Sequence, residues 1–426
     1  MATARVDVDS LIRGLCEELD VRLGDADAEL ARRYPGNHGG RQPVHTVYVA
    51  GGRYRAGLIS EWGATALSAL DEHAALFDEL VNDDDIVARV RAKLVEEPIE
   101  DLRIDFEDGY GAASDETEDG HVSTVGFALA RSRVDGSGSP FAGIRIKSLE
   151  PQTRRRAVRT CVGFVASLAD CGASVEDFVI TLPKVSSIEQ VEAMVSLCEV
   201  IERTLGVGRL RFEIQVETPQ SIVGHDGAAL VARMIHASDG RCLGLHYGTY
   251  DYSAFCGIAA PYQSLAHPAA DHAKLVMQAA AAGTGVRLSD GSTNRFPVGG
   301  PAIVRQSWEE HLRLVRRSLE RGYYQGWDLH PGQLPTRFAA TFAFYRENLG
   351  EATRRLRDYF AQAESAVADE PATIRALADY ALRALQCGAA TVTELRDATG
   401  LDAQGLAQLA GRARWRTDVT NSRSPG

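Results

Sequence analysis

Short apolar runs alternate with longer stretches of helical spacing through most of the chain. Eight such runs are expected as strands, at residues 44–50, 102–109, 141–147, 178–184, 210–217, 242–247, 286–289 and 324–330. Between them, stretches such as residues 154–168 and 188–205 place apolar side chains every three or four positions, as helices that cover a sheet do. Strands that alternate with helices form parallel sheets. The chain is therefore predicted to be an α/β protein, and eight β/α units predict a (β/α)8 TIM barrel.

A doubly wound open sheet is the alternative arrangement of the same elements. That fold usually binds its ligand through a glycine-rich loop after the first strand, and no GxGxxG or Walker-type loop follows residues 44–50. The barrel is expected over residues 41–348. Residues 1–40 are expected as a helical extension packed under it, residues 349–416 as a helical segment for oligomerisation or a lid, and residues 417–426 as a disordered tail.

Composition narrows the classes of partner. The net charge of −12 disfavours nucleic acid, because binding a phosphate backbone depends on clustered Lys and Arg. No run reaches the roughly 18 apolar residues that a membrane span needs. The seven cysteines form no CxxC pair, which is typical of reduced thiols in a cytoplasmic protein. We therefore expect a cytoplasmic protein that binds neither nucleic acid nor membrane.

Several predicted strands carry polar side chains at alternate positions. The second, third, fifth and eighth strands place these residues on one face: Arg103, Asp105 and Glu107; Arg145 and Lys147; Glu213, Gln215 and Glu217; Asp328 and His330. If the apolar faces meet the helices, the polar faces converge inside the barrel, where buried charges need ion pairs or a metal. We expect Arg103 and Glu213, which lie deeper, to form an interior ion-pair layer.

Two acids follow neighbouring predicted strands. Glu217 ends the fifth run, and Asp251 follows the sixth in Gly248-Thr249-Tyr250-Asp251. The carboxyl ends of the strands meet at one edge of a barrel, where active sites form. Carboxylate oxygens suit Mg²⁺ or Mn²⁺, which need one or two of them and leave other positions for water and substrate. The pair predicts a metal site formed by Glu217 and Asp251.

Lysine is rare in this chain. Only four of the 46 basic residues are lysine, and two of these, Lys147 and Lys184, end predicted strands. Where arginine is the usual cation, such a lysine is a candidate for a compact or titratable amine, with chance placement as the alternative. Lys147 is also a candidate for substrate contact, as are His246, Asp328 and His330. Their alternatives are a hydrogen-bonded core histidine and a structural His-Pro turn.

Six short segments occur in an order that is known from one family. They are Ile104-Asp105-Phe106-Glu107-Asp108, Gly143-Ile144-Arg145-Ile146, Leu182-Pro183-Lys184-Val185, Val216-Glu217-Thr218, Gly248-Thr249-Tyr250-Asp251 and His330-Pro331-Gly332-Gln333. In these segments the chain resembles the HpcH/HpaI aldolase and citrate lyase β-subunit family, part of the phosphoenolpyruvate/pyruvate barrel superfamily, over about residues 44–348. It looks like a divergent branch, because residues 109–119 and 250–257 depart from the family pattern.

The resemblance implies a role for each matching residue. Glu217 and Asp251 match the acids that hold Mg²⁺ in the family, and Arg145 matches the arginine that faces the carboxylate and developing enolate of a 2-oxo acid. Asp105, Glu107 and Asp108 fall in an acidic segment that in the family orients the metal waters and nearby side chains. Lys184 matches the lysine of the Pro-Lys strand end. The family also implies a homo-oligomer, trimeric or hexameric, and an acyl-CoA as a possible partner.

These residues predict a Mg²⁺-dependent carbon–carbon lyase of aldolase or citrate lyase type. A small 2-oxo acid, such as pyruvate, oxaloacetate or glyoxylate, chelates the metal, which stabilises an enolate as a bond breaks or forms. Arg145 supplies a second fixed positive charge. Asp108, Glu107, His330 or a metal-bound water are the candidates for the base. Two alternatives stay open: a Schiff-base aldolase that uses a strand-end lysine, and a non-catalytic barrel that senses a metabolite.

Overall fold

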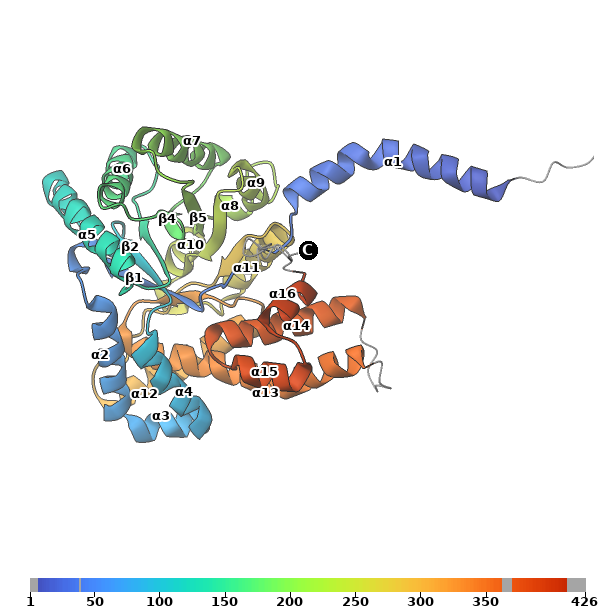
Figure 1. Cartoon of the computed structure of the whole chain (residues 1–426). Coiled ribbons are helices and arrows are strands. Elements are labelled where there is room, and N and C mark those ends of the chain that lie inside the picture. Colours follow the sequence, from blue (N-terminus) through green and yellow to red (C-terminus); the bar gives the residue numbers. More distant parts are fainter. Residues whose placement is uncertain (1–6, 38–39, 362–369, 412–426) are drawn as a thin grey trace, which may run out of the picture.

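Eight parallel strands form a barrel at the centre of the molecule (Figure 1). The strands are β1 (His45–Ala50), β2 (Asp101–Asp105), β3 (Phe141–Arg145), β4 (Phe178–Leu182), β5 (Arg211–Val216), β6 (Cys242–Tyr247), β7 (Arg287–Ser289) and β8 (Gly326–Asp328). Their order is β7-β6-β5-β4-β3-β2-β1-β8, and a parallel bridge between Ser289 and Gln325 joins the two edges. This computed structural model describes residues 7–37, 40–361 and 370–411.

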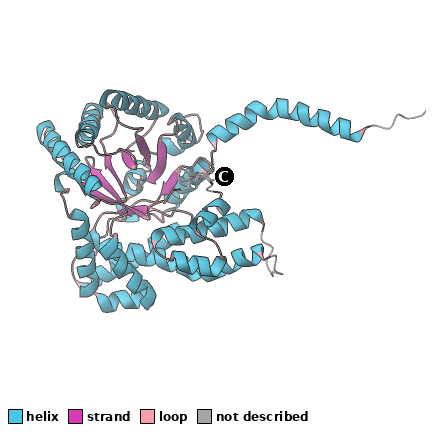
Figure 2. Cartoon of the chain, viewed as in Figure 1, coloured by secondary structure: helices cyan, strands magenta, loops and turns pink. Residues whose placement is uncertain are grey.

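Helices connect successive strands and surround the barrel (Figure 2). They are α2 (Leu58–Glu72), α3 (Ala74–Val81), α4 (Asp84–Glu96), α5 (Asp115–Asp135), α6 (Arg154–Asp170), α7 (Ile188–Leu205), α8 (Pro219–Ile222), α9 (Leu230–Ala237), α10 (Thr249–Phe255), α11 (Pro268–Ala281), α12 (Pro301–Glu320) and α13 (Leu334–Phe360). Local chemistry sets their ends: Ser187 and Gln190 form a capping box at the start of α7, and Gly206 ends it with a left-handed φ. The predicted TIM barrel is confirmed.

The outward faces of the strands carry the apolar core. Leu102 and Ile104 of β2, and Phe212 and Ile214 of β5, are fully buried between the barrel wall and its helices. Full burial of one such side chain contributes about 1.5–3 kcal/mol. This layer therefore stabilises a barrel whose interior is largely polar.

The predicted interior ion-pair layer is present. Arg103 crosses the barrel, and its Nε donates to Glu213 Oε1 at 3.0 Å while its Nη2 donates to Asp101 Oδ2 at 2.8 Å. His246 Nε2 lies 2.9 Å from Glu213 Oε2 on the other side. Glu213 is thus surrounded by partners, and these attractions outweigh its burial and hold its pKa below the usual range.

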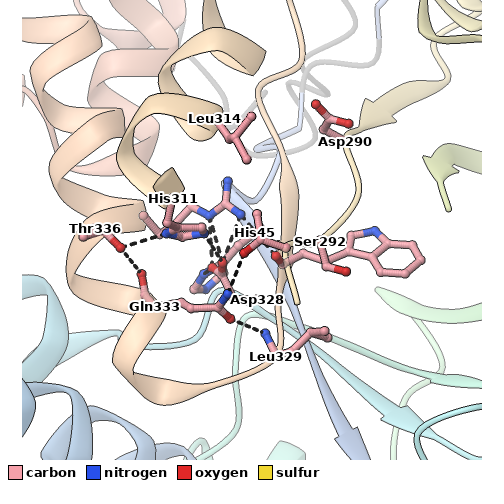
Figure 3. A network of polar contacts seen from close by, with 12 residues as sticks. His45, Asp290, Ser292, His311, Leu314, Asp328, Leu329, Gln333 and Thr336 are labelled. Carbon is pink, nitrogen blue, oxygen red and sulfur yellow. Dashed lines mark hydrogen bonds and ion pairs between the residues drawn. The ribbon is translucent and has the colours of Figure 1, made fainter. Parts of the chain in front are cut away.

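Strand β8 contradicts the expected alternation. Trp327 points into the barrel, where its ring lies 4.7 Å from that of Tyr48, and Asp328 points outward to the helices (Figure 3). Asp328 accepts from Arg337 Nη2 at 3.0 Å and lies 2.8 Å from His45 Nδ1 and 3.2 Å from His311 Nε2. A buried carboxylate needs partners. Those of Asp328 are Arg337 on α13, His311 on α12 and the outward-facing His45 of β1, all on the helix side of the barrel wall.

The carboxyl-terminal helices pack beside the barrel. Helices α14 (Pro371–Cys387), α15 (Val392–Thr399) and α16 (Ala403–Leu409) lie against α13 or against one another. From α14, Arg383 donates to Gln42 Oε1 at 3.0 Å and lies 4.2 Å from the ring of Tyr324. Gln42 and Tyr324 precede β1 and β8, so this contact is at the amino-terminal end of the barrel. The lid expectation is therefore wrong for the described part of the segment, and a role in oligomerisation stays a prediction.

The amino-terminal helix does not pack under the barrel, and that expectation is wrong. Helix α1 (Val8–Arg33) projects from the body of the molecule, and none of its residues is buried (Figure 1). Its apolar side chains therefore face solvent. Within the described ranges, none of the helices combines the length and the apolar character that crossing a membrane requires.

Candidate active site

The acids and bases singled out from the sequence converge at the carboxyl edge of the barrel. Arg145 is the last residue of β3, and Glu217 follows β5 directly. Lys184 follows β4 by two residues, Glu107 follows β2 by two, and Asp251 lies in the first turn of α10 after β6. We call these five residues, with Asp105 and Asp108, the edge cluster. It brings together five adjacent strands of the barrel.

Arg145 is held in a fixed orientation inside the barrel mouth. Its Nε and Nη2 donate to the two oxygens of Asp105 at 2.7 and 2.6 Å, and its Nη1 lies 3.3 Å from Glu107 Oε2. The guanidinium also covers the ring of Tyr48 at 4.9 Å. Burial alone would lower the pKa of Arg145, but the carboxylate of Asp105 keeps it well above the usual value. The side chain is therefore a permanent positive charge with little freedom.

Lys184 links the acids of the cluster. Its backbone has a φ of +51°, in the left-handed region that costs a non-glycine residue about 1–2 kcal/mol. Its Nζ donates to Glu107 Oε1 and to Asp108 Oδ2, the latter at 2.8 Å, and lies 3.7 Å from Asp251 Oδ2. Burial alone would lower the pKa of Lys184, but Glu217 and Glu107 raise it above its usual value. The amine is therefore held as an ammonium.

Glu217 is the buried carboxylate of the cluster, with 1% of its surface exposed. Its Oε1 accepts the backbone N–H of Lys184 at 2.7 Å. On its other side a Cβ at Gly248 would collide with the Glu217 side chain, so the glycine makes room for this acid. Burial raises the pKa of Glu217 to about 8, against the attraction of Lys184 and with further repulsion from Asp251.

The cluster contains more acids than cations. Its members are five acids and two cations: Asp105, Glu107, Asp108, Glu217, Asp251, Arg145 and Lys184. Burial raises the pKa of Glu107 to about 7, and it raises the pKa of Asp251 as well. The raised pKa values mean that Arg145 and Lys184 do not fully offset the burial of these carboxylates and their mutual repulsion. A further positive charge at this place would stabilise the ionised carboxylates.

The donor set fits a hard divalent cation that keeps open positions. Among the described residues, no group of three or more His, Cys, Asp and Glu is arranged to hold a metal by protein ligands alone. Mg²⁺ needs only one or two carboxylates and takes its other ligands from water and substrate. Glu217 and Asp251 supply two carboxylates, and oxygen donors of this kind are what such an ion binds once they are ionised. Their raised pKa values in the metal-free protein indicate that a compensating positive charge is missing beside them.

Two of the expected substrate contacts have other partners. Lys147 Nζ donates to the carbonyl of Phe106 at 2.7 Å and to Glu118 Oε2 at 2.8 Å. Its partner Glu118 stands in the first turn of α5, so the structure ties Lys147 to a helix outside the barrel. His246 accepts from Trp327 Nε1 at 3.0 Å and pairs with Glu213 deep inside the barrel. Neither side chain joins the edge cluster.

The other two expected substrate contacts, Asp328 and His330, lie at the end of β8. Asp328 is fully buried on the helix side of the barrel wall, where its oxygens meet Arg337, His45 and His311. Its pKa is lowered well below the usual range by these partners, of which Arg337 acts most strongly against the effect of burial. His330 Nδ1 accepts the backbone N–H of Gly332 at 3.0 Å and caps the turn that leads into α13. Both positions fit the structural alternative, and substrate contact by His330 stays a prediction.

Two residues below the cluster carry buried polar groups that sequence reasoning gave no role. The hydroxyl of Tyr48, and both amide atoms of Gln215, are buried and have no hydrogen-bond partner among the described residues. Gln215 alternates with Glu213 and Glu217 on β5, so it points into the barrel between them. The period-two alternation of polar residues in the fifth predicted strand already indicated that Gln215 points into the barrel. No local signal singled out Tyr48, whose role depends on the distant Arg145.

The larger cavities of the described residues lie at the opposite end of the barrel. One of about 670 Å³ is lined by residues that begin strands, among them Phe141, Arg211 and Arg287. Its charged lining residues include Glu176, Asp177 and Arg209, which stand at the amino-terminal end of the barrel, away from the edge cluster.

Solved structures with similar chains were found at low identity. A Haloferax volcanii malate synthase in a magnesium and glyoxylate complex is 15% identical, with 89% of this chain and 100% of that chain covered and a TM-score of 0.48. HpcH/HpaI family proteins from Burkholderia cenocepacia J2315 and Desulfitobacterium hafniense DCB-2 are 15% and 14% identical, with TM-scores of 0.37 each. They cover 76% and 70% of this chain and 98% and 90% of their own. At these TM-scores the likenesses carry no inference about function.

No curated protein matches the chain. A family model matches residues 23–414, which include the whole barrel and the described carboxyl-terminal helices. The chain belongs to the family described as a domain of unknown function, DUF6986.

Proposed function

We propose that this protein is a divalent-metal-dependent carbon–carbon lyase or condensing enzyme that acts on a small 2-oxo acid. One observation carries the proposal. A rigid guanidinium, that of Arg145, lies beside a surplus of carboxylates at the carboxyl edge of a TIM barrel. A 2-oxo acid needs both a cation for its carboxylate and a second positive centre for the charge that develops on its carbonyl oxygen.

Glu217 and Asp251 would hold the metal ion, Mg²⁺ or Mn²⁺. When bound, the ion would act as a Lewis acid that stabilises the enolate form of the substrate. The residues themselves prepare for this: Glu217 is positioned by the Lys184 N–H, and Gly248 leaves room beside it. Asp251 stands in the first turn of α10, with 37% of its side chain exposed, where solvent reaches it.

Arg145 would bind the carboxylate of the 2-oxo acid. Asp105 takes two of its nitrogens, and the fork is held against Tyr48, so the direction of its remaining N–H groups is fixed. Preorganised charge of this kind lowers a barrier because no side chain has to reorient during the reaction. The Tyr48 hydroxyl and the Gln215 amide, which are buried without a hydrogen-bond partner among the described residues, offer further hydrogen bonds near Arg145 and Glu217.

Glu107 is the best-placed group to move a proton. Burial raises its pKa to about 7, which is the range in which a general acid or base works at neutral pH. It contacts both Lys184 and Arg145, so its charge would respond to the charge of a bound substrate. Asp108 is more exposed, and its pKa is lowered by Glu107 and Lys184 against the effect of burial, which makes it a weaker base.

The Schiff-base alternative is disfavoured by the state of Lys184. A nucleophilic lysine needs a lowered pKa, whereas Glu217 and Glu107 hold this one as an ammonium. Lys147 is likewise paired with Glu118. The resemblance in the sequence adds two points to the proposal. The second substrate would be an acyl-CoA thioester, and the protein would assemble as a homo-oligomer.

The proposal is tested by ligand binding and turnover together. Mg²⁺ and oxalate, which mimics an enolpyruvate, are expected to stabilise the wild-type protein in thermal unfolding only when both are present. Glu217→Gln should lose this effect, and Glu192→Gln, on the exposed face of α7, should keep it. Turnover then distinguishes a lyase from a metabolite sensor. The assay measures release of pyruvate from a 4-hydroxy-2-oxo acid, or release of the corresponding 2-oxo acid from an acyl-CoA adduct. Binding of Mg²⁺ and oxalate unchanged in Glu217→Gln would overturn the assignment.

A further inference from the structure

Helix α1 presents an apolar stripe with nothing packed on it. The helix runs from Val8 to Arg33, which is roughly 39 Å at 1.5 Å per residue. Eight large apolar side chains along it are about half exposed or more: Val8, Leu11, Ile12, Leu15, Leu19, Val21, Leu23 and Leu30. Figure 1 shows the helix standing clear of the barrel. An apolar face of this length is a docking surface.

The sequence intervals between the apolar residues on one face of α1 are the same when they are counted from either end of the helix. One face carries, in order, Val8, Ile12, Leu15, Leu19, Leu23, Ala26 and Leu30. The intervals are four, three, four, four, three and four residues, so the set is symmetric about Leu19. A surface that repeats itself when reversed is self-complementary in the way that a twofold interface requires.

We propose that α1 docks antiparallel on the α1 of a second copy of this chain, around a twofold axis at Leu19. The symmetry places Val8 opposite the partner's Leu30, Leu15 opposite the partner's Leu23, and the two copies of Leu19 against each other. Ile12 would face the partner's Ala26, which pairs a large side chain with a small one. Each of the seven residues in this symmetric set then meets another apolar residue of the set.

The charges beside the stripe agree with this pairing. In the antiparallel arrangement, Arg22 lies on the same side of the helix pair as the partner's Glu18, at nearly the same height along the helix axis. Arg13 and the partner's Asp27 are related in the same way. The twofold axis repeats both pairs, which gives four opposite-charge contacts along the seam. Such flanking pairs set orientation more than affinity, so they favour the antiparallel register over others.

The composition of α1 also indicates that it needs a partner. Gly14 and Gly24 lie inside the helix, and each costs about 1 kcal/mol relative to alanine in a helix interior. Helices gain most of their stability in proteins from the packing of an apolar face. No contact with the barrel supplies that packing to α1, since none of its residues is buried. A second α1 would supply it.

The attachment of α1 leaves the edge cluster free. Gly36 N–H donates to the carbonyl of Gly283 at 2.8 Å, and the ring of Tyr34 meets that of His236 edge-on at 5.5 Å. Gly283 lies just before β7, so the helix departs from the amino-terminal end of the barrel. Two copies joined through α1 would keep both carboxyl edges open, and the inference does not depend on the proposed function.

Disulfide crosslinking of the full chain tests the orientation. Val8→Cys and Leu30→Cys are made separately in a background where the exposed Cys16 and Cys256 are serine. Under mild oxidation, a mixture of the two variants should give a crosslinked dimer, and either variant alone should not. Crosslinking of Val8→Cys with itself would show a parallel pair and overturn the proposal. Absence of any crosslink would overturn it too, and would leave the barrel of the same chain or another protein as the occupant.

Self-association measured by analytical ultracentrifugation gives a second test. Leu19→Asp would bring two carboxylates together in an apolar contact and should raise the dissociation constant of the α1-mediated contact at least about 100-fold. Val21→Asp is the matched control, because Val21 is 87% exposed on the opposite face of α1 and should change nothing. Circular dichroism at equal concentrations checks that both variants keep the barrel folded. Equal association of Leu19→Asp and wild type would overturn the proposal.

Discussion

Asp105 clamps Arg145 through two hydrogen bonds of 2.7 and 2.6 Å, and the same carboxylate accepts the backbone N–H groups of Glu107 and Gly109 at 2.9 Å each. One side chain therefore fixes both the guanidinium and the loop that carries Glu107. The proposed substrate cation and the proposed proton carrier are positioned by a single buried residue. Geometry at the mouth of the barrel depends on Asp105 more than on any residue that would touch substrate.

Asp105→Asn is expected to reduce both stability and activity. The substitution leaves Arg145 buried beside an uncharged amide in place of a carboxylate. Breaking a buried ion pair in this way costs about 3–5 kcal/mol of folding stability. Released from Asp105, Arg145 should pair with Glu107, so kcat/KM should fall by a factor of at least about 100. Urea unfolding and turnover measure the two effects. Asp71→Asn, which breaks the exposed pair with Arg91, should cost less than about 1 kcal/mol. Similar losses in both variants would refute this reasoning.

Lys184→Gln is expected to tighten metal binding. The ammonium of Lys184 now compensates Glu107, Asp108 and Asp251, so it competes with a cation for the same charge. Its removal should increase the affinity for Mn²⁺ at least about 10-fold, because a positive charge a few ångströms from the ion is lost. Titration calorimetry and the Mn²⁺ resonance signal report binding directly. Lys93→Gln, far from the cluster, is the control.

The same residue separates the two aldolase mechanisms. Wild-type protein incubated with a 2-oxo acid and borohydride should gain no mass at Lys184, because the amine is held protonated. A reduced adduct on Lys184 would support the Schiff-base alternative instead. Weaker Mn²⁺ binding in Lys184→Gln would show that the ammonium does not compete with the metal.

Glu217→Gln is expected to change how the metal-free protein responds to pH. Burial raises the folded pKa of Glu217 to about 8, whereas an unfolded glutamate titrates near 4.3. The folded state therefore holds a proton that the unfolded state releases, and stability falls as pH rises from about 5 through 8. Glutamine has no proton to lose, so the variant should have the higher Tm at pH 8 and a similar Tm at pH 5. A wild-type Tm that does not fall over this interval relative to the variant would contradict the burial effect.

The strands and the edge cluster were predictable because their signals are local or periodic. Alternation along β2 and β5 identified Arg103 and Glu213 as interior residues, and strand ends identified Glu217 and Asp251. A barrel brings strand ends together whatever the loops do, so the meeting of these acids followed from topology. The contribution of Tyr48 was not predictable, because its position over Arg145 depends on two strands that are distant in sequence.

Two of the predictions that were wrong, on the faces of β8 and on the packing of α1, also have physical causes. In β8, three residues are too few to show which face is buried, and the outward turn of Asp328 follows from Arg337, which lies on another element. In α1, the apolar spacing correctly predicted a helix. The spacing does not identify the surface against which a helix packs, and the expected packing under the barrel was wrong.

The network around Asp328 gives the last prediction, on acid stability. Burial would raise the pKa of Asp328, but Arg337 and the two histidines His311 and His45 lower it well below the usual range. A carboxylate with a lowered folded pKa stabilises the protein above its unfolded pKa, near 3.9, and this contribution is lost as pH falls toward the folded value. Asp328→Asn should thus be less stable than wild type by about 3–5 kcal/mol at pH 7, since Arg337 is left buried without its charge partner. The difference should shrink below about pH 4. Urea unfolding at pH 7, 5 and 3.5 measures it, and a difference that stays constant with pH would mean that packing, not charge, gives Asp328 its role.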